Sequence, residues 1–236
     1  MSNKRAPRVE TIFDEYKLRM KQPSQTGGKD ATIVPRTHEN NPGLRVRTNV
    51  DNDKNNGLID AGMDAITWQT LIVKMEEIAK GPNGERFTVK NFGHPFINGQ
   101  RSREKKQMST TSVWKDDNGI CWISVTAGPQ RPHIEFKFVS DEYHNFLDKD
   151  NNPLSDALVS KYTMLATARM WGSLMANVLE ANYDTPQWII DSRAKFAGGQ
   201  NNGGGGGQKK HWNQPQPQQN NNSGGSSSSF DDDIPF

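Results

Sequence analysis

The chain is poor in cysteine, and its 236 residues include only Cys121. A single cysteine excludes a disulfide framework and a cysteine-rich zinc site. Hydrophobic residues make up 32% of the chain, and no apolar run approaches the roughly 20 residues that a membrane-spanning helix needs. The first residues lead into no apolar signal-peptide segment. We therefore expect a soluble protein of the cell interior.

The shortage of apolar residues is concentrated near the C-terminus. Between residues 197 and 229 the only apolar side chains are Ala197 and Trp212, among many Gly, Gln, Asn and Ser residues. Such a composition cannot offset the entropy lost when a backbone becomes ordered. We therefore predict four parts: a basic N-terminal arm (1–29), a folded domain (30–196), a disordered linker (197–229) and a short acidic tip (230–236).

The net charge of +2, from 29 basic and 27 acidic residues, conceals a separation of charge along the chain. Residues 1–29 hold seven basic and three acidic side chains, and residues 86–106 hold six basic side chains against Glu104 alone. Acidic side chains gather later, at Asp141, Glu142, Asp148, Asp150 and Asp156. Because the positive charge is segregated, the nearly neutral total does not argue against an anionic ligand.

Two blocks of alternating apolar and polar residues predict two sets of strands, each followed by a helix. The first block predicts a helix that Asp64 caps and that ends near Lys80, after strands over 31–34, 44–50 and 57–61. The second predicts a helix over 155–182, after strands over 86–92, 107–115, 119–127 and 131–139. The expected fold class is therefore α+β, with antiparallel sheets in the order strands-then-helix, twice.

The alternation also separates the two faces of each strand. Cys121, Ile123 and Val125 share an apolar face, whereas the solvent faces of the strands collect Arg, Lys, Trp and Phe. Cations follow a phosphate backbone and aromatic rings stack on unpaired bases, so this mixture is typical of proteins that bind single-stranded nucleic acid. The predicted DNA contacts are Arg45, Arg47, Lys90, Phe92, Arg101, Arg103, Lys105, Lys106, Trp114, Trp122 and Lys137.

Two plainer explanations stand beside that prediction. A one-residue error in register exchanges the faces of a strand, which would place Trp114 or Trp122 in the core. Exposed Arg and Lys side chains on strands also keep a protein soluble and protect sheet edges. The strand faces alone therefore favour nucleic-acid binding and an ordinary polar surface about equally.

Several features that look chemical have ordinary explanations. The five histidines have no metal-ligand spacing with one another or with Cys121, so no metal site is expected. Gly203–Gly207 lacks the Gly-Lys-Ser/Thr core of a phosphate loop. Cys121 lies on an apolar face without a basic neighbour in sequence, which indicates a buried thiol. We expect no catalytic site and no cofactor, so the protein is predicted not to be an enzyme.

The chain ends in Phe230-Asp231-Asp232-Asp233-Ile234-Pro235-Phe236, after the Gly-, Gln-, Asn- and Ser-rich stretch. This ending resembles the C-terminal tip of bacterial and bacteriophage single-stranded DNA-binding proteins. The resemblance implies that residues 231–236 dock on replication, recombination and repair enzymes. Ile234, Pro235 and Phe236 would enter an apolar groove, and the three aspartates would meet basic residues around it. The resemblance covers only the tip and the character of the linker.

A second stretch, from Gly57 through Trp68 to Ile78, is similar to the strand-into-helix step of PUR and Whirly repeats. Those families place an antiparallel sheet before a helix, pair two such units and bind single strands across the sheet. The similarity agrees with the strands-then-helix count. The alternative is an OB-fold with additions, although an OB-fold usually has its helix between strands three and four.

These observations lead to one functional hypothesis and two rivals. The hypothesis is a sequence-independent single-stranded DNA-binding protein, cytoplasmic in a bacterial cell or a phage-infected host. It would coat and protect DNA and recruit enzymes through its tip. Its expected partners are single-stranded DNA and those enzymes, with a homo-oligomer also compatible and no membrane. The rivals are an RNA-binding or annealing protein and a structural assembly protein with an acidic docking tail.

Overall fold

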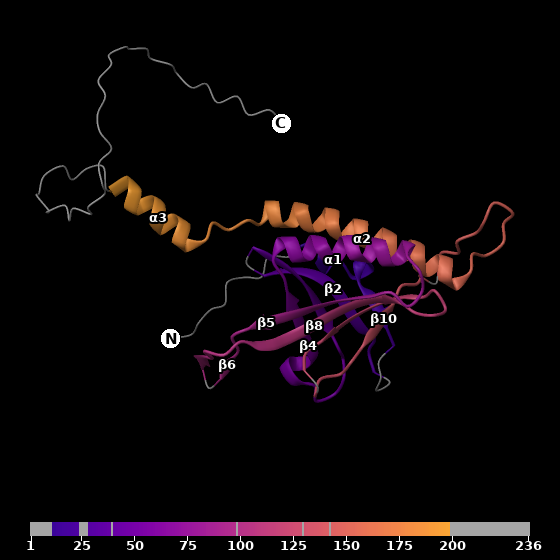
Figure 1. The fold of residues 1–236 in the computed structure, drawn as a ribbon, viewed down its shortest axis with the longest axis horizontal. Coiled ribbons are helices and arrows are strands. Elements are labelled where there is room, and N and C mark those ends of the chain that lie inside the picture. The colour runs from indigo at the N-terminus through magenta and orange to yellow at the C-terminus, as the bar shows by residue number, and fades with distance from the viewer. Residues whose placement is uncertain are drawn as a thin grey trace, which may run out of the picture. The chain divides into compact units, whose positions relative to one another are not determined.

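The computed structural model describes residues 11–23, 28–38, 40–97, 99–128, 130–141 and 143–198. They fall into two compact units, of which the first ends at Thr185 and the second begins at Pro186. Within these ranges the fold is mixed α+β, with two antiparallel four-stranded sheets and three α-helices (Figure 1). None of the described helices combines the length and the apolar character needed to cross a membrane.

The first sheet is an antiparallel meander in which neighbouring strands follow one another in sequence. Its strands are β1 (Met20–Gln22), β2 (Ala31–His38), β3 (Asn41–Arg47) and β4 (Leu58–Gly62). Ile33, Val46 and Ile59 lie opposite one another on the buried face, and Val34, Arg45 and Asp60 do so on the outer face. A short 3₁₀ turn, η3 (Lys54–Gly57), precedes β4. The period-two pattern of the sequence thus sets which face is covered.

Helix α1 (Ala65–Lys80) follows the first sheet directly. The Asp64 carboxylate accepts a hydrogen bond from the backbone N–H of Thr67 at 2.8 Å, which satisfies one of the free donors at the start of the helix. One stripe of the helix is buried, at Trp68, Leu71, Ile72, Met75, Ile78 and Ala79. The helix ends at Gly81, as the Gly81-Pro82 pair predicts.

The second sheet is also antiparallel, in the order β10-β9-β8-β5. Its strands are β5 (Arg86–Gly93), β8 (Lys106–Lys115), β9 (Cys121–Thr126) and β10 (Glu135–Lys137). A two-stranded hairpin of β6 (Phe96–Ile97) and β7 (Gln100–Arg101) is inserted between β5 and β8. Gly119 closes the turn between β8 and β9 with a φ of 79°, a conformation that glycine adopts without strain.

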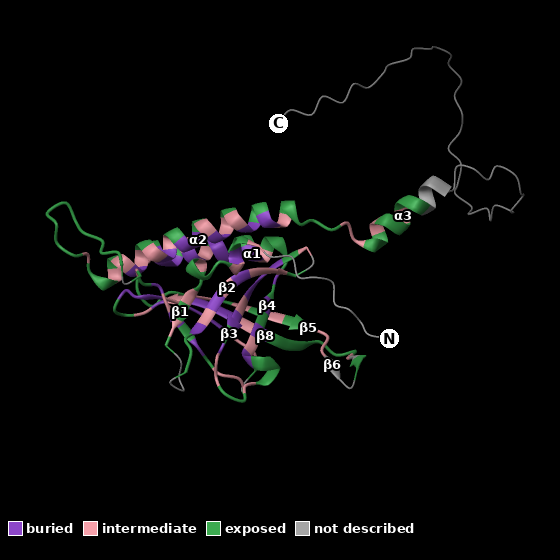
Figure 2. Ribbon diagram, turned by 180° about the vertical axis from the view of Figure 1, so that it is seen from behind, coloured by how far each residue is buried: buried purple, intermediate pink, exposed green. Residues whose placement is uncertain are grey.

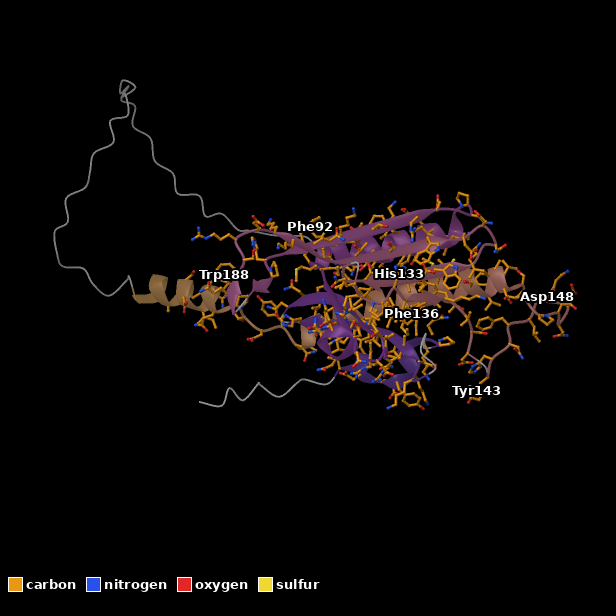
Figure 3. The ribbon with its side chains drawn as sticks, turned by 90° about the horizontal axis from the view of Figure 1, so that it is seen from below. Phe92, His133, Phe136, Tyr143, Asp148 and Trp188 are labelled. Carbon is orange, nitrogen blue, oxygen red and sulfur yellow. The ribbon has the colours of Figure 1, made fainter. Side chains whose placement is uncertain are left out.

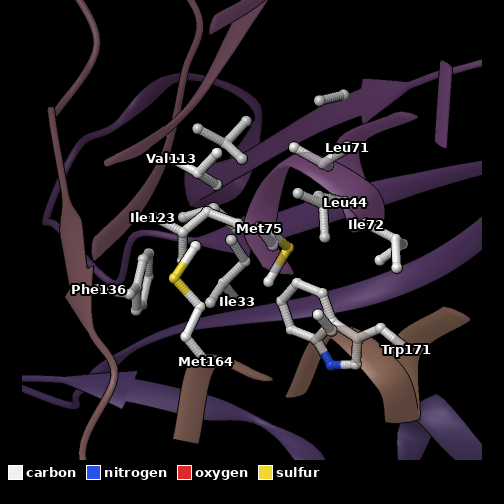
Figure 4. Packing of buried hydrophobic residues seen from close by; sticks show 14 of the residues in the cluster. Ile33, Leu44, Leu71, Ile72, Met75, Val113, Ile123, Phe136, Met164 and Trp171 are labelled. Atoms are coloured by element: carbon white, nitrogen blue, oxygen red, sulfur yellow. The ribbon is translucent and has the colours of Figure 1, made fainter. Parts of the chain in front are cut away.

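Helix α2 (Asp156–Ala181) completes the first unit. It lies beside α1 along one side of the two sheets (Figures 1 and 2). The rings of Trp68 and Trp171 stack between the helices, with centroids 6.4 Å apart. Figure 4 shows the adjoining core, where side chains from both sheets and both helices meet. One continuous core therefore joins the two strands-then-helix repeats.

Helix α3 (Gln187–Gly198) belongs to the second unit. Pro186 precedes its first turn, and the Pro186 carbonyl accepts the backbone N–H of Ile189. Trp188 is largely exposed. Residues 199–229 of the expected linker and the tip 230–236 lie outside the described residues.

The folded unit includes part of the segment that the sequence assigns to the N-terminal arm. Residues 11–22 form two 3₁₀ turns, η1 (Ile12–Asp14) and η2 (Tyr16–Leu18), and strand β1, which pairs with β2. Phe13 is buried in the core, and Met20 packs against it. Without β1, β2 would be an unpaired edge of the sheet. Composition alone does not reveal that residues 20–22 pair with this edge.

One expected strand is shorter in the structure and another is shifted, since β3 runs over Asn41–Arg47. The strand expected over 131–139 is reduced to Glu135–Lys137. Its first residue, Arg131, leaves the sheet because its guanidinium forms a buried ion pair with Asp53. The strand expected over 44–50 ends at Arg47, after which Asn49 adopts a positive φ. In each case a side-chain contact or a backbone turn ends the strand before the alternating sequence pattern ends.

Candidate nucleic-acid interface

The outer face of the second sheet carries one aligned row of large side chains. The strand register places Arg86 of β5 opposite Trp114 of β8, Trp114 opposite Trp122 of β9, and Trp122 opposite Lys137 of β10. Residues at the same height of an antiparallel sheet have Cβ atoms about 5 Å apart, so the four side chains are neighbours. We call this set the tryptophan row.

The two indoles of the row are nearly parallel. The centroids of Trp114 and Trp122 lie 6.2 Å apart with an interplanar angle of 10°. The guanidinium carbon of Arg86 lies over the Trp114 ring, 4.7 Å from its centroid, in a cation–π arrangement. Both tryptophans are partly exposed, so the row presents aromatic surface and positive charge together. The structure therefore places neither tryptophan in the core.

Carboxylates hold the other end of the row in place. Trp122 Nε1 donates a hydrogen bond of 2.9 Å to Asp116 Oδ2, and Lys137 Nζ lies 3.6 Å from Asp156 Oδ2. Burial raises the pKa of Asp116, but hydrogen bonds from Trp122 and from two backbone N–H groups outweigh it and bring the pKa below the ordinary value. Asp116 therefore stays ionised at neutral pH and fixes the orientation of the Trp122 ring.

Small hydroxyl side chains occupy the face beyond the tryptophan row. Thr88 and Ser112 share a hydrogen bond of 3.0 Å, and Ser112 lies opposite Ser124. The next pair along the sheet is Thr110 and Thr126. Ser112 and Ser124 are buried, whereas Thr88, Thr110 and Thr126 keep exposed surface.

The far end of β5 carries Lys90 and Phe92, and Phe92 is 61% exposed (Figure 3). Both side chains line an open groove of about 720 Å³ between the two sheets. The groove is also lined by three side chains of the first sheet, Arg36, His38 and Asp60. β4 and β5 are each the last strand of their sheet, so the groove lies between two sheet edges.

The structure does not bring Arg45 and Arg47 to the tryptophan row. Arg45 lies on the outer face of the first sheet and donates two hydrogen bonds to Asp60, of 2.7 and 3.0 Å. Arg36 also pairs with Asp60, at 2.8 Å. The single Asp60 carboxylate thus offsets only part of the positive charge of the two arginines. Arg47, at the end of β3, is exposed.

The remaining predicted contacts belong to the inserted hairpin and the chain that follows it. Arg101 lies in β7, although its side chain is outside the description, and Arg103, Lys105 and Lys106 are exposed. They adjoin the end of β5 opposite to Arg86. Seven residue steps separate Arg86 from Gly93, which corresponds to about 23 Å along the strand. The predicted contacts therefore form two separate clusters on the second sheet.

Sequence reasoning missed Arg86 and Asp116 as members of the site. The Trp114–Trp122 pair follows from the hairpin turn at 116–119, because a tight turn fixes the register of the strands that it joins. The register of β5 against β8 has no such signal, since the inserted hairpin separates them and a bulge shifts the pairing after Asn91. The position of the Arg86 guanidinium over Trp114 therefore cannot be predicted from the spacing of residues in the sequence.

In the part of the chain that the structure describes, we also searched for metal-binding groups and for a reactive cysteine. Within it, no group of three or more His, Cys, Asp or Glu side chains is placed to hold a metal ion. Cys121 is buried, and burial raises the pKa of its thiol. Comparison with known proteins finds no matching family model, no matching curated protein and no matching solved structure.

Proposed function

We propose that this protein binds single-stranded DNA without sequence preference, coats it, and recruits replication, recombination and repair enzymes through Asp231–Phe236. The observation that carries the proposal is the tryptophan row, in which Arg86, Trp114, Trp122 and Lys137 align across all four strands of one sheet. The character of the C-terminal tip supports the second half of the proposal.

The chemistry of the row suits unpaired bases. Indoles and guanidinium groups stack on any base because every base has a π-face, and Lys137 supplies charge for the phosphates. Paired bases are already stacked in a duplex, so the row favours single strands. Stacking of this kind does not depend on which base is present, which fits binding without sequence preference.

Arg86 has a particular role in this proposal. In the free protein its guanidinium covers one face of Trp114. A base can displace the guanidinium from the ring or stack on it, and in both cases the Arg86 charge stays within reach of the adjoining phosphate. The site therefore exchanges one stacked cation for a base on the covered face of the indole.

The order of the elements supports a PUR- or Whirly-like fold for the domain. Each sheet is a four-stranded meander followed by its own helix, which is the arrangement that those families use. An OB-fold is a single five-stranded barrel, and two open four-stranded sheets do not resemble it.

The experiment that tests the function is a titration with dT oligomers at two salt concentrations, following tryptophan fluorescence. We expect quenching, weaker binding at high salt and a much smaller response to duplex DNA. Trp114→Leu should weaken binding about tenfold or more, since a stacked base contributes about 1–3 kcal/mol. Trp188→Leu, a matched change in α3, should leave the affinity unchanged.

The outcomes separate the proposal from its rivals. Equal affinity for matched RNA and DNA oligomers would favour an RNA-binding or annealing protein, because only the 2′-hydroxyl distinguishes them. No binding at low salt would favour a structural assembly protein that uses its acidic tail for docking. Loss of affinity in Trp188→Leu but not in Trp114→Leu would move the site away from the second sheet.

A further inference from the structure

The two ends of the first unit expose apolar side chains among charges of opposite sign. The hairpin end and the segment 139–156 lie at opposite ends of this unit (Figures 1 and 3). The exposed side chains of the first, which we call the basic end, are Phe92, Arg103, Lys105, Lys106 and Met108, with Glu104 among them. Those of the second, which we call the acidic end, are Val139, Asp141, Tyr143, Phe146, Leu147, Asp148 and Asp150, with Lys149 among them, 3.9 Å from Asp150.

The acidic end is built to present apolar surface. Tyr143 is 81% exposed, and Phe146 and Leu147 are 42% and 50% exposed. Beside them is a groove of about 240 Å³ that Val139, Phe146, Leu154 and Val159 help to line. A contiguous group of exposed apolar side chains on a small domain marks an interaction surface more often than chance exposure.

The carboxylates around this surface are held in place and ionised. Asp148 accepts hydrogen bonds from the backbone N–H groups of Asp150 and Asn152, at 2.8 and 2.9 Å. Asp141 Oδ1 and His144 Nδ1 share a hydrogen bond of 2.6 Å. These hydrogen bonds lower the pKa of both carboxyl groups. The acidic end is therefore a preorganised, negatively charged rim around an apolar patch.

We propose that the acidic end of one copy binds the basic end of a second copy, so that molecules associate head to tail. Phe92 and Met108 cover the apolar patch beside Phe146, and the basic side chains face Asp141 and Asp150. A contact between two different surfaces of the same chain builds an open row unless its rotation closes it into a ring. The charge complementarity of the two ends selects a second copy as the occupant.

The consequence of this contact on DNA rests on the function proposed above. The tryptophan row adjoins the acidic end, because Lys137 pairs with Asp156, and Lys90 and Phe92 lie toward the basic end. Head-to-tail contact brings the basic end of one copy to the tryptophan row of the next. A strand that follows the second sheet then passes from copy to copy.

The test begins without DNA, by sedimentation velocity of the full chain at low and high salt. We expect association at low salt that weakens at high salt. Asp150→Lys or Lys105→Asp alone should weaken association about tenfold. The double variant Asp150→Lys/Lys105→Asp should recover it, because the charges are exchanged across the same contact. Asp51→Lys, an equal charge change in the β3–β4 connection, is the control.

Two results would overturn the head-to-tail contact: a wild-type protein that stays monomeric at low salt, or single variants whose loss the double variant does not recover. A second measurement keeps the proposed function separate. Asp150→Lys should bind a short dT oligomer like the wild type and bind long DNA with less cooperativity. If the short oligomer fails to bind the wild type, the DNA-binding proposal fails while the sedimentation result stands.

Discussion

A single buried ion pair links two connections that are distant in sequence. Asp53, before η3, accepts hydrogen bonds of 2.5 and 2.8 Å from the Arg131 guanidinium. Arg131 also donates to the Leu58 carbonyl, at the start of β4. The Asp53 and Arg131 side chains are 2% and 7% exposed. A pair this well shielded is costly to break because the remaining charge stays buried.

This pair predicts a pH-dependent stability. Burial raises the pKa of Asp53, but hydrogen bonds from Arg131 and Thr48 and the Arg131 charge bring it below the ordinary value. Its contribution is therefore present above about pH 4 and lost as the pH falls through the lowered value. Asp53→Asn should cost about 3 kcal/mol at pH 7 in urea unfolding, and its difference from the wild type should shrink as the pH falls below about 4.

The control for that experiment is Asp51→Asn, a carboxylate in the same connection that is exposed. It should behave like the wild type across the pH range, since replacing it leaves the Asp53–Arg131 pair intact. An Asp53→Asn curve parallel to the wild type from pH 7 to pH 3 would remove the ion pair as the source of the pH dependence.

At the scale of elements, the end of α1 depends on a side chain from the second sheet. Lys115, on β8, is buried, and its Nζ donates hydrogen bonds of 2.6 and 3.2 Å to the carbonyls of Gly81 and Ala79. The last carbonyls of a helix have no partner within the helix. Lys115 therefore supplies a cap from outside and joins α1 to the sheet.

Replacing this lysine tests the cap directly. Lys115→Met keeps the length and the apolar stem but leaves two carbonyls without a donor, and we expect a loss of about 1–3 kcal/mol in the free energy of unfolding. Lys80→Met, at an exposed lysine that pairs with Glu76 on α1, should cost well under 1 kcal/mol. Equal effects of the two variants would show that the cap adds nothing beyond a surface charge.

The elements also show what the sequence can and cannot predict. Strand and helix positions follow from local alternation and caps, so α1, α2 and the core residues of β9 lie where the pattern predicts them. Strand β1 and the β6–β7 hairpin were not anticipated, because short edge strands carry too few residues to show a period. Arg86 joined the site only through a long-range register, which no local pattern encodes.

At the scale of the whole molecule, the proposed function divides the work between the folded domain and the tip. Removal of residues 230–236 should leave DNA affinity unchanged or higher, because the tip carries three negative charges and no proposed DNA contact. The same truncation should abolish binding to a replication or repair enzyme of the host, measured by surface plasmon resonance. A protein with the tip retained and residues 208–222 deleted is the control and should bind the enzyme.

The truncation separates the two parts of the proposal. A loss of DNA affinity on removal of the tip would contradict the assignment of DNA binding to the folded domain. Retained enzyme binding would show that recruitment uses another surface, and the resemblance of the tip to that of single-stranded DNA-binding proteins would then have no functional meaning here.

The second sheet is asymmetric, with two indoles near Arg86 and the exposed Lys90 toward the opposite end of β5. A single DNA strand is also asymmetric, because its 5′ and 3′ ends differ. An asymmetric face that holds such a strand along its length favours one sense of it over the other. Under the proposed function, copies that all lie in the same sense would give the coated strand a direction, and an enzyme that displaces them from one terminus would meet the same surface of every copy in turn.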